Sequence, residues 1–198
     1  MNIVCLLGSP RPGGNSVTLA RRFLETAASL GAQTRTFHLN QLAYRGCQAC
    51  YACKNKLDHC LLDDDLTEVL AAVAEAQVLV TATPVYFGEV SSQLKGFIDR
   101  TFSYLKPDYL TNPNPCRLAP GKQWVFIASQ GHGDEDVFAD IYPRYAYFFK
   151  WFGFAATHSI RACGVRQPGE VAARAEVMAQ AEAVARQVMA RYRQGEEG

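Results

Sequence analysis

Residues 2–20 read NIVCLLGSPRPGGNSVTLA, and this stretch decides the fold class. The segment up to Gly8 is apolar on both faces, as expected of a buried strand. A loop of Gly, Pro and Ser follows, and the apolar spacing then predicts a helix from Ser16 to Leu30 with Gly31 as its C-terminal cap. A buried strand that leads directly into a helix is the building unit of parallel sheets with helical layers.

The same alternation continues along the chain. Further strands are predicted at residues 32–39, 77–84, 122–131 and 156–165, and the first of these has the polar and apolar alternation of an edge strand. Helices are predicted at residues 63–76, 91–105, 134–154 (interrupted by Pro143) and 168–194, with Pro168 in the first turn. This order predicts an α/β fold whose mostly parallel, five-stranded sheet is covered by helices on both faces.

The length of 198 residues fits a single domain spanning 1–198, and the chain has no internal repeat or low-complexity segment. Within this domain we expect a cysteine-rich insertion at 46–60, a long loop rich in Pro and Asn at 106–122, and a mobile tail at 195–198.

Composition narrows the class of protein. Twenty basic and nineteen acidic side chains give a net charge of +1, so nothing predisposes the chain to nucleic acid or to anionic lipid. The longest apolar runs, such as VLVTATPVYF, are shorter than the roughly 18 residues that span a bilayer. The N-terminus reads as a buried strand and not as a signal peptide. We therefore expect a cytoplasmic protein without a membrane partner, whose thiols stay reduced.

The loop after the first strand has the composition of an anion site. Gly13 and Gly14 widen its range of backbone conformations, and Ser9, Asn15, Ser16 and Thr18 offer polar groups. The loop enters a helix N-terminus, where free N–H groups and the helix dipole favour one phosphate. It matches neither the Walker pattern nor the G-x-G-x-x-G fingerprint. The alternative interpretation is a Gly-Pro turn with an ordinary serine N-cap.

Two further loops follow the third and fourth strands, at the edge where open parallel sheets bind ligands. In TPVYFGEVSSQLKGFIDR (83–100), a turn shaped by Pro84 and Gly88 presents Val85, Tyr86 and Phe87, and Ser91 or Ser92 begins the next helix. Such a turn suits a flat ring with polar edges; the alternative is that one of the two aromatic residues is core, which is less plausible for both because adjacent strand residues face opposite sides. In SQGHGDE (129–135), Ser129, Gly131 and Gly133 permit a close approach to a ligand, and His132 lies either at the pocket mouth or in solvent.

These motifs resemble the flavodoxin-like NAD(P)H-dependent FMN reductases. GSPRPGGNS resembles their phosphate loop, and Pro84, Tyr86, Gly88, Lys95, Asp99 and Arg100 stand in register with their P-x-Y-x-G…K-x-x-x-D-R segment. The resemblance covers essentially the whole chain and implies a doubly wound sheet of strand order 2-1-3-4-5 that binds FMN. It implies the phosphate contacts Ser9, Arg11, Asn15, Ser16, Val17 and Thr18, with Arg11 the only full charge nearby. It implies the ring contacts Pro84, Val85, Tyr86, Phe87 and Gly88, and Ser129, Gly131 and His132 on the far side.

A segment between the second strand and second helix, GCQACYACKNKLDHC (46–60), carries Cys47, Cys50, Cys53 and Cys60 in the spacing C-x2-C-x2-C-x6-C. Two-residue gaps are typical of iron–sulfur motifs, and zinc fits a run of three less well. The odd total of seven cysteines argues against a fully paired disulfide framework. The segment resembles that of the iron-sulfur flavoproteins, which implies a [4Fe-4S] cluster near the flavin edge; free or oxidisable thiols are the alternative. Cys5, Cys116 and Cys163 are interpreted as unrelated, and Asp64 or Asp65 as a helix cap.

The sequence thus predicts an FMN-dependent NAD(P)H oxidoreductase of the flavin or quinone reductase type, with or without electron transfer through a [4Fe-4S] cluster. The electron acceptor is expected to be a quinone, a flavin or a redox protein. No catalytic side-chain pair is visible, and flavin chemistry requires none. The alternatives are a non-enzymatic electron carrier, either flavodoxin-like or iron-sulfur flavoprotein-like, and a zinc-bound structural or regulatory domain. The resemblance predicts a homodimer or homotetramer, and the aromatic segment YPRYAYFFKWF (142–152) is either surface for this contact or part of the core.

Overall fold

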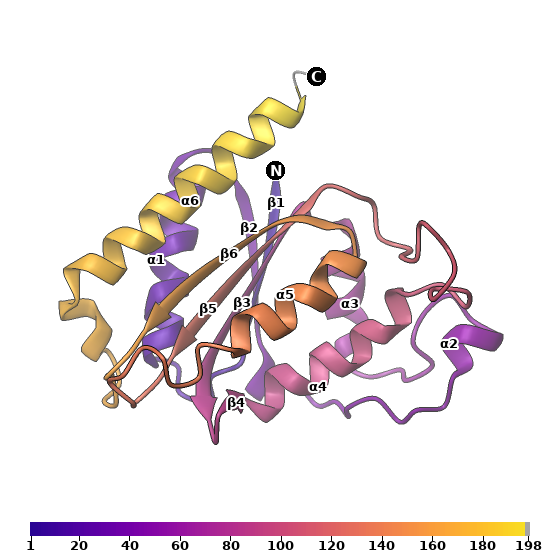
Figure 1. The fold of residues 1–198 in the computed structure, drawn as a ribbon, viewed down its shortest axis with the longest axis horizontal. Helices are drawn as coiled ribbons and strands as arrows, with labels where there is room; N and C mark the ends of the chain where they lie inside the picture. The colour runs from indigo at the N-terminus through magenta and orange to yellow at the C-terminus, as the bar shows by residue number, and fades with distance from the viewer. Residues whose placement is uncertain (197–198) are drawn as a thin grey trace.

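The computed structural model describes residues 1–196 and contains one twisted sheet with helices on both faces (Figure 1). Its parallel strands follow the order β2-β1-β3-β5-β6, and a short β4 pairs antiparallel with β3. Without β4, which the sequence did not predict, this is the expected order 2-1-3-4-5. The strands are β1 (Asn2–Leu7), β2 (Gln33–His38), β3 (Val78–Tyr86), β4 (Glu89–Val90), β5 (Lys122–Ser129) and β6 (Phe154–Ala162).

The helices form a layer on each face of the sheet. Helices α1 and α6 lie on one face, and α3, α4 and α5 lie on the other (Figure 1). The α-helices are α1 (Asn15–Ser29), α2 (Ala52–Asn55), α3 (Leu66–Glu75), α4 (Ser92–Arg100), α5 (Ile141–Trp151) and α6 (Ala175–Glu196). Short 3₁₀ turns are η1 (Leu39–Gln41), η2 (Thr101–Tyr104) and η3 (Glu170–Ala173).

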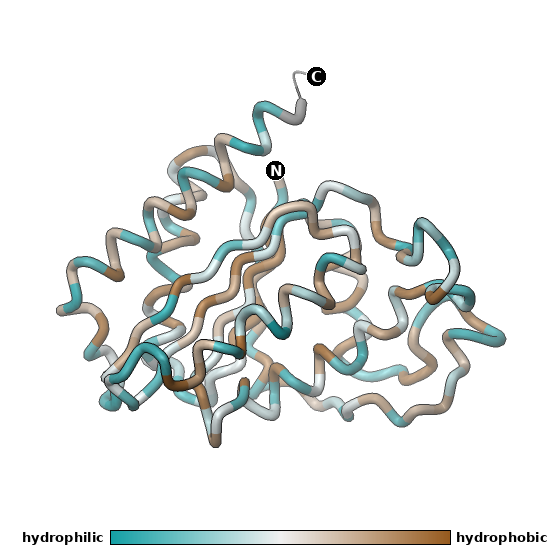
Figure 2. The backbone as a smooth tube through the Cα atoms, viewed as in Figure 1, coloured by the Kyte–Doolittle hydropathy of each residue, from teal (hydrophilic) through white to brown (hydrophobic). Residues whose placement is uncertain are grey.

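Strand periodicity explains the two layers. Alternate residues of β1 point to opposite faces, so Ile3 and Leu7 pack with α1 and α6 while Val4 and Leu6 pack with the other helices. The apolar colouring of the central strands in Figure 2 reflects this burial on both sides. A hydrophobic core therefore packs against each face of the sheet, and the loops lie at its carboxyl edge.

Three local predictions were wrong in detail. Residues 134–140 are not helical, and α5 begins only at Ile141, so Pro143 stands in its first turn, where a missing N–H costs no intrahelical bond. The last helix begins at Ala175, beyond the turn η3, so Pro168 precedes it instead of opening it. Ser16 is not the N-cap of α1, because Gly14 occupies that position and Ser16 lies inside the first turn.

The predicted insertions lie outside the main sheet, except that Lys122, the last residue of the predicted 106–122 loop, begins β5. The 106–122 loop is closed at its base, where Lys106 N–H donates to the Pro115 carbonyl and Arg117 N–H to that of Tyr104. Of the tail predicted to be mobile, residues 195–196 belong to the backbone of α6, and residues 197–198 lie outside the described residues. Across residues 1–196, no helix has both the length and the apolar character needed to cross a membrane.

Candidate functional site

The loop between β1 and α1 presents unpaired donors. The first helical bond of α1 runs from Thr18 N–H to the Gly14 carbonyl, so the N–H groups of Asn15, Ser16 and Val17 precede the intrahelical ladder. The Ser16 hydroxyl is buried and has no hydrogen-bond partner among the described residues. A buried hydroxyl without a partner is unfavourable, and an anion at this helix end would supply one.

Close backbone packing shapes the same loop. A Cβ atom on Gly14 would stand 2.7 Å from Ser9 Oγ and 3.1 Å from the Arg11 carbonyl oxygen. At the end of β1, a Cβ on Gly8 would stand 2.7 Å from Ser91 Oγ, which donates to the Gly8 carbonyl and caps α4 by accepting from Leu94 N–H. These glycines let the loop fold back on itself and let α4 dock against the end of β1. The prediction that Ser91 or Ser92 begins this helix is confirmed, with Ser91 as the N-cap and Ser92 as the first helical residue.

The loops after β1, β3 and β5 meet around one cavity of about 230 Å³. Strand register explains the meeting, because Pro84 of β3 pairs with Ser129 of β5 at the carboxyl edge. The cavity is lined by Ser9, Arg11, Gly14, Asn15, Pro84, Val85, Tyr86, Ser129, Gly131, Val165, Arg166 and Pro168. The structure thus brings together predicted residues from all three loops.

A fourth segment, 165–168, also lines this cavity and was not predicted. Arg166 is a second cation beside Arg11, so the expectation that Arg11 would be the only nearby charge was wrong. Arg11 Nη1 donates to the Arg166 carbonyl, and Arg166 Nε donates to the Gly131 carbonyl. No sequence motif marks Arg166, because it becomes a neighbour of the phosphate loop only through β6 lying beside β5.

Asn15 has a structural role that the sequence did not predict. Its side-chain amide donates to the Gln167 carbonyl, and its amide oxygen accepts from Val171 N–H. These bonds fasten the start of α1 to the segment around η3, so Asn15 offers a ligand chiefly its backbone N–H. Val17 is a core residue, and the Thr18 hydroxyl donates to the Gly14 carbonyl; neither residue lines the cavity.

The turn between β3 and β4 has two residues with positive φ, Phe87 (49°) and Gly88 (77°). This is the backbone of a type I′ hairpin turn, which favours Asn-Gly and is strained for a residue with a bulky side chain. The Phe87 ring is fully exposed, and Tyr86 is 44% exposed. Two aromatic rings are therefore held in solvent beside the cavity at a conformational cost.

The remaining predicted residue, His132, is exposed and does not line this cavity. Its ring Nδ1 accepts from Asp134 N–H within the loop. Gln130, which was not singled out, orders this loop by donating its amide to the carbonyls of His132, Asp134 and Val137.

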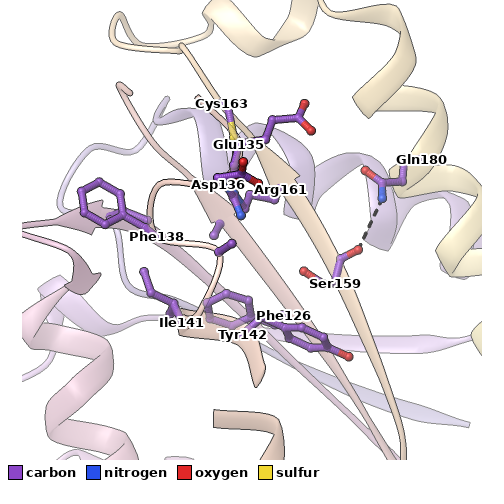
Figure 3. A pocket seen from close by; sticks show the side chains of 13 residues that line it. Phe126, Glu135, Asp136, Phe138, Ile141, Tyr142, Ser159, Arg161, Cys163 and Gln180 are labelled. Carbon is purple, nitrogen blue, oxygen red and sulfur yellow. Dashed lines mark hydrogen bonds between the residues drawn. The ribbon is translucent and has the colours of Figure 1, made fainter. Parts of the chain in front are cut away.

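A larger cavity, of about 520 Å³, lies beside the first and shares Val85 with it. Figure 3 shows aromatic and aliphatic side chains along one part of its wall and charged groups gathered in another. The apolar part includes Phe126, Phe138, Ile141 and Tyr142, and the charged part Glu135, Asp136 and Arg161. Arg161 holds the covering loop, because its guanidinium donates to the Glu135 and Val137 carbonyls.

The four cysteines of residues 46–60 line a separate cavity of about 320 Å³. Ala49 and Tyr51, on either side of Cys50, have left-handed backbone conformations (φ 50° and 55°), which are strained for these residues. Within residues 1–196 no group of three or more His, Cys, Asp or Glu side chains is arranged to hold one metal ion. All seven cysteines are free thiols. A polynuclear cluster takes one cysteine at each iron, so it tolerates wider spacing than a single ion does.

This cavity lies against the C-terminal end of α4, at Arg100, and against η2, at Phe102 and Ser103. The phosphate loop lies near the other end of α4, at Ser91, and the two cavities share no lining residue. Figure 1 shows α2 and the N-terminus of α1 on opposite sides of the molecule. Within one chain, therefore, the cysteines do not adjoin the cavity at the carboxyl edge.

Asp64 and Arg100 anchor the cysteine segment to α3 and α4. Burial raises the pKa of Asp64, but hydrogen bonds from Arg100 and from Arg45 N–H outweigh this and hold the pKa below its usual range. Asp64 Oδ1 also accepts from Leu66 N–H, the capping role predicted for Asp64 or Asp65.

Comparisons with known proteins agree with this geometry. The sequence profile of the family described as NADPH-dependent FMN reductase matches residues 1–139 of the 198. An iron-sulfur flavoprotein of Methanocaldococcus jannaschii is 38% identical over 101 residues, 51% of this chain and 52% of the relative. One of Methanosarcina thermophila is 36% identical over 101 residues, with the same coverage of 51% and 52%. The alignment thus spans about half the length of these relatives.

Solved structures share the fold. An NAD(P)H:quinone oxidoreductase from Methanothermobacter marburgensis superposes with a TM-score of 0.75 at 18% identity, covering 95% of this chain and 96% of that one. An FMN-dependent NADH-azoreductase from Bacillus anthracis in complex with FMN superposes with a TM-score of 0.71 at 16% identity, covering 96% and 100%. The flavodoxin-like fold predicted from the sequence is confirmed.

Proposed function

Because the chain belongs to the NADPH-dependent FMN reductase family, we propose that it is an FMN-dependent NAD(P)H oxidoreductase acting on a small-molecule acceptor such as a quinone or a free flavin. When bound, FMN supplies the chemistry, since it takes a hydride from a nicotinamide and releases electrons to the acceptor. The protein binds, orients and shields the reacting groups.

The observation that carries this proposal is the unpartnered, buried Ser16 hydroxyl at the N-terminus of α1. Ser16 does not itself line the cavity, but the preceding residue, Asn15, lines it together with Arg11 and Arg166, and the free N–H groups of the first turn lie at the same helix end. A phosphate ester, which carries a charge near −2, would receive hydrogen bonds from the helix end and face two cations. The loop between β1 and α1 fits such a group because residue 14 is a glycine, and a Cβ atom there would collide with Ser9 as the loop folds back.

The segment 84–88 would hold the isoalloxazine ring. Pro84, Val85 and Tyr86 line the same cavity as the phosphate loop, and Ser129 and Gly131 line it from β5. Phe87, Gly88 and His132 lie outside that lining, and we propose that they meet the ring or the second substrate from the solvent side. The exposed rings of Tyr86 and Phe87 offer flat apolar surface for this contact.

We further propose that Cys47, Cys50, Cys53 and Cys60 ligate a [4Fe-4S] cluster. Two observations support it: all four thiols line one cavity, and the curated relatives are named iron-sulfur flavoproteins. With this cluster the electron acceptor would include a one-electron redox protein as well as a small molecule.

Self-association is also proposed. Phe87, Tyr147 and Phe148 are large apolar residues exposed on this chain, and a second copy would cover such surface. Light scattering of the purified protein tests this directly. A homodimer or homotetramer is expected, and a monomer at micromolar concentration would contradict it.

The enzymatic proposal is tested by steady-state turnover. Purified protein reconstituted with FMN should oxidise NADH or NADPH in the presence of a quinone at a rate that saturates with both substrates. A non-enzymatic carrier would turn over negligibly unless its own reductase were added. Iron and acid-labile sulfide analysis after anaerobic purification tests the cluster separately, because quinone reduction by FMN does not require it.

A further inference from the structure

Beneath the cysteine cavity lie three cations, Lys54, Arg100 and Arg117, which we call the cationic floor. The side chain of Arg100 is fully buried, and Lys54 is buried at 8% exposure. Arg100 lines the cavity directly, and Lys54 Nζ lies 3.5 Å from the sulfur of Cys53. The Arg117 guanidinium donates to the Cys53 carbonyl.

Two of the three cations have no carboxylate partner. Lys54 Nζ donates to the carbonyls of Phe102 and Leu105 at 2.6 and 2.8 Å and stands 4.1 Å from the centre of the Phe102 ring. Arg117 donates to the carbonyls of Ser103, Leu105 and Cys53. Neither forms an ion pair with any residue in the described range 1–196. Only Arg100 is paired, with Asp64.

Arg100 also has a donor left over. Its terminal nitrogens are used by Asp64, by the Arg45 carbonyl and by the Leu62 carbonyl, but its Nε is buried without a partner among the described residues. Burying a cation without countercharge and a donor without an acceptor both cost free energy. Lys54 is buried without an ion-pair partner, Arg117 is half-buried without one, and Arg100 keeps an unused buried donor, so an anion is expected to lie beside them.

The cavity itself supplies the sulfur ligands for that anion. Neutral thiols or disulfides would leave Lys54 and Arg117 without an ion-pair partner, whereas four thiolates around a [4Fe-4S]²⁺ core carry a net charge of −2. We propose that the cationic floor stabilises the negative charge of this group and thereby sets its reduction potential. This inference rests on the cluster proposed above and adds the residues that control it.

The direction in which these cations shift the reduction potential follows from their charge. One-electron reduction takes the group from −2 to −3, so nearby cations stabilise the reduced form more than the oxidised form and raise the potential. Removing one close cation should therefore favour the oxidised form by roughly tenfold, a fall in midpoint potential of about 59 mV.

The experiment measures the midpoint potential of the anaerobically purified holoprotein by titration with dithionite, which supplies the electron, monitored by electron paramagnetic resonance. The variants are Lys54→Met and Arg117→Gln, and Lys54→Arg restores the charge. The matched control is Lys122→Met, because Lys122 is also buried and bonded to backbone carbonyls, those of Val73, Ala74 and Ala76, but unlike Lys54 and Arg117 it has no hydrogen bond to Cys53. Iron content is measured on every sample.

The proposal expects lower potentials in Lys54→Met and Arg117→Gln at unchanged iron content, and wild-type potentials in Lys54→Arg and Lys122→Met. Unchanged potentials in both charge-removing variants with full iron content would overturn it, because the cations would then serve only to hold the backbone carbonyls; the proposed cluster would survive that result. Wild-type protein that takes up no iron would overturn the cluster and this inference together.

Discussion

Replacing Ser16 by alanine should have opposite effects on the apoprotein and on cofactor binding. The hydroxyl is buried and unpartnered in this structure, and an unsatisfied buried polar group costs about 1–3 kcal/mol. Its removal should therefore leave the free energy of unfolding of the apoprotein unchanged or raise it by about 1 kcal/mol. If the same hydroxyl donates to the FMN phosphate, Ser16→Ala also removes a hydrogen bond to a charged group, and such a bond contributes about 1.5–3 kcal/mol to binding. The Kd for FMN should then rise about 10- to 100-fold.

Two assays separate these effects. Urea unfolding of the apoprotein gives the free energy of unfolding, and quenching of flavin fluorescence gives the Kd. Thr26→Val is the matched control, because it removes an exposed hydroxyl from the same helix, one that donates to the Arg22 carbonyl. The control should change neither quantity by more than about 0.5 kcal/mol. A Ser16→Ala protein that is destabilised yet binds FMN with wild-type affinity would refute the reasoning.

Three other predictions follow from the geometry. Gly14→Ala should weaken FMN binding at least about tenfold in the same titration, because its Cβ would lie 2.7 Å from Ser9 Oγ, whereas Gly13→Ala, with open space around it, should not. Phe87→Asn should stabilise the apoprotein by about 1 kcal/mol in urea, because it places Asn-Gly at the type I′ turn; a lower stability would contradict the assigned strain. Asp64→Asn should cost about 3 kcal/mol at neutral pH by leaving buried Arg100 unpaired. Because folding lowers the pKa of Asp64, the contribution of Asp64 to wild-type stability should be lost as pH falls below about 4, and pH-dependent unfolding of Asp64→Asn should show a shallower loss.

The fold could be predicted because its signals are local. Strands such as β3 and β5 are apolar on both faces, and that pattern occurs where helices cover both sides of a parallel sheet. The loop residues Ser9, Arg11, Pro84 and Ser129 could be assigned to one edge for the same reason, since the carboxyl ends of parallel strands lie together.

What the sequence did not reveal depends on contacts between distant segments. Arg166 reaches the phosphate loop only because β6 lies beside β5, and Asn15 is tied to residues 167–171 by bonds that no local motif encodes. Ser16 is not the N-cap of α1 because the backbone places Gly14 at that position, and the residue types of the loop do not reveal this. The cysteine cavity was expected near the flavin edge, but the length of α4 separates it from the phosphate loop within one chain.

The most direct test of the central claim is a titration of metal-free apoprotein with FMN under anaerobic conditions, followed by addition of NADPH or NADH. We predict saturation at one FMN per chain and loss of the oxidised flavin spectrum when the nicotinamide is added. An apoprotein that is folded by circular dichroism but takes up no FMN would contradict the claim that the loops after β1, β3 and β5 form a flavin site.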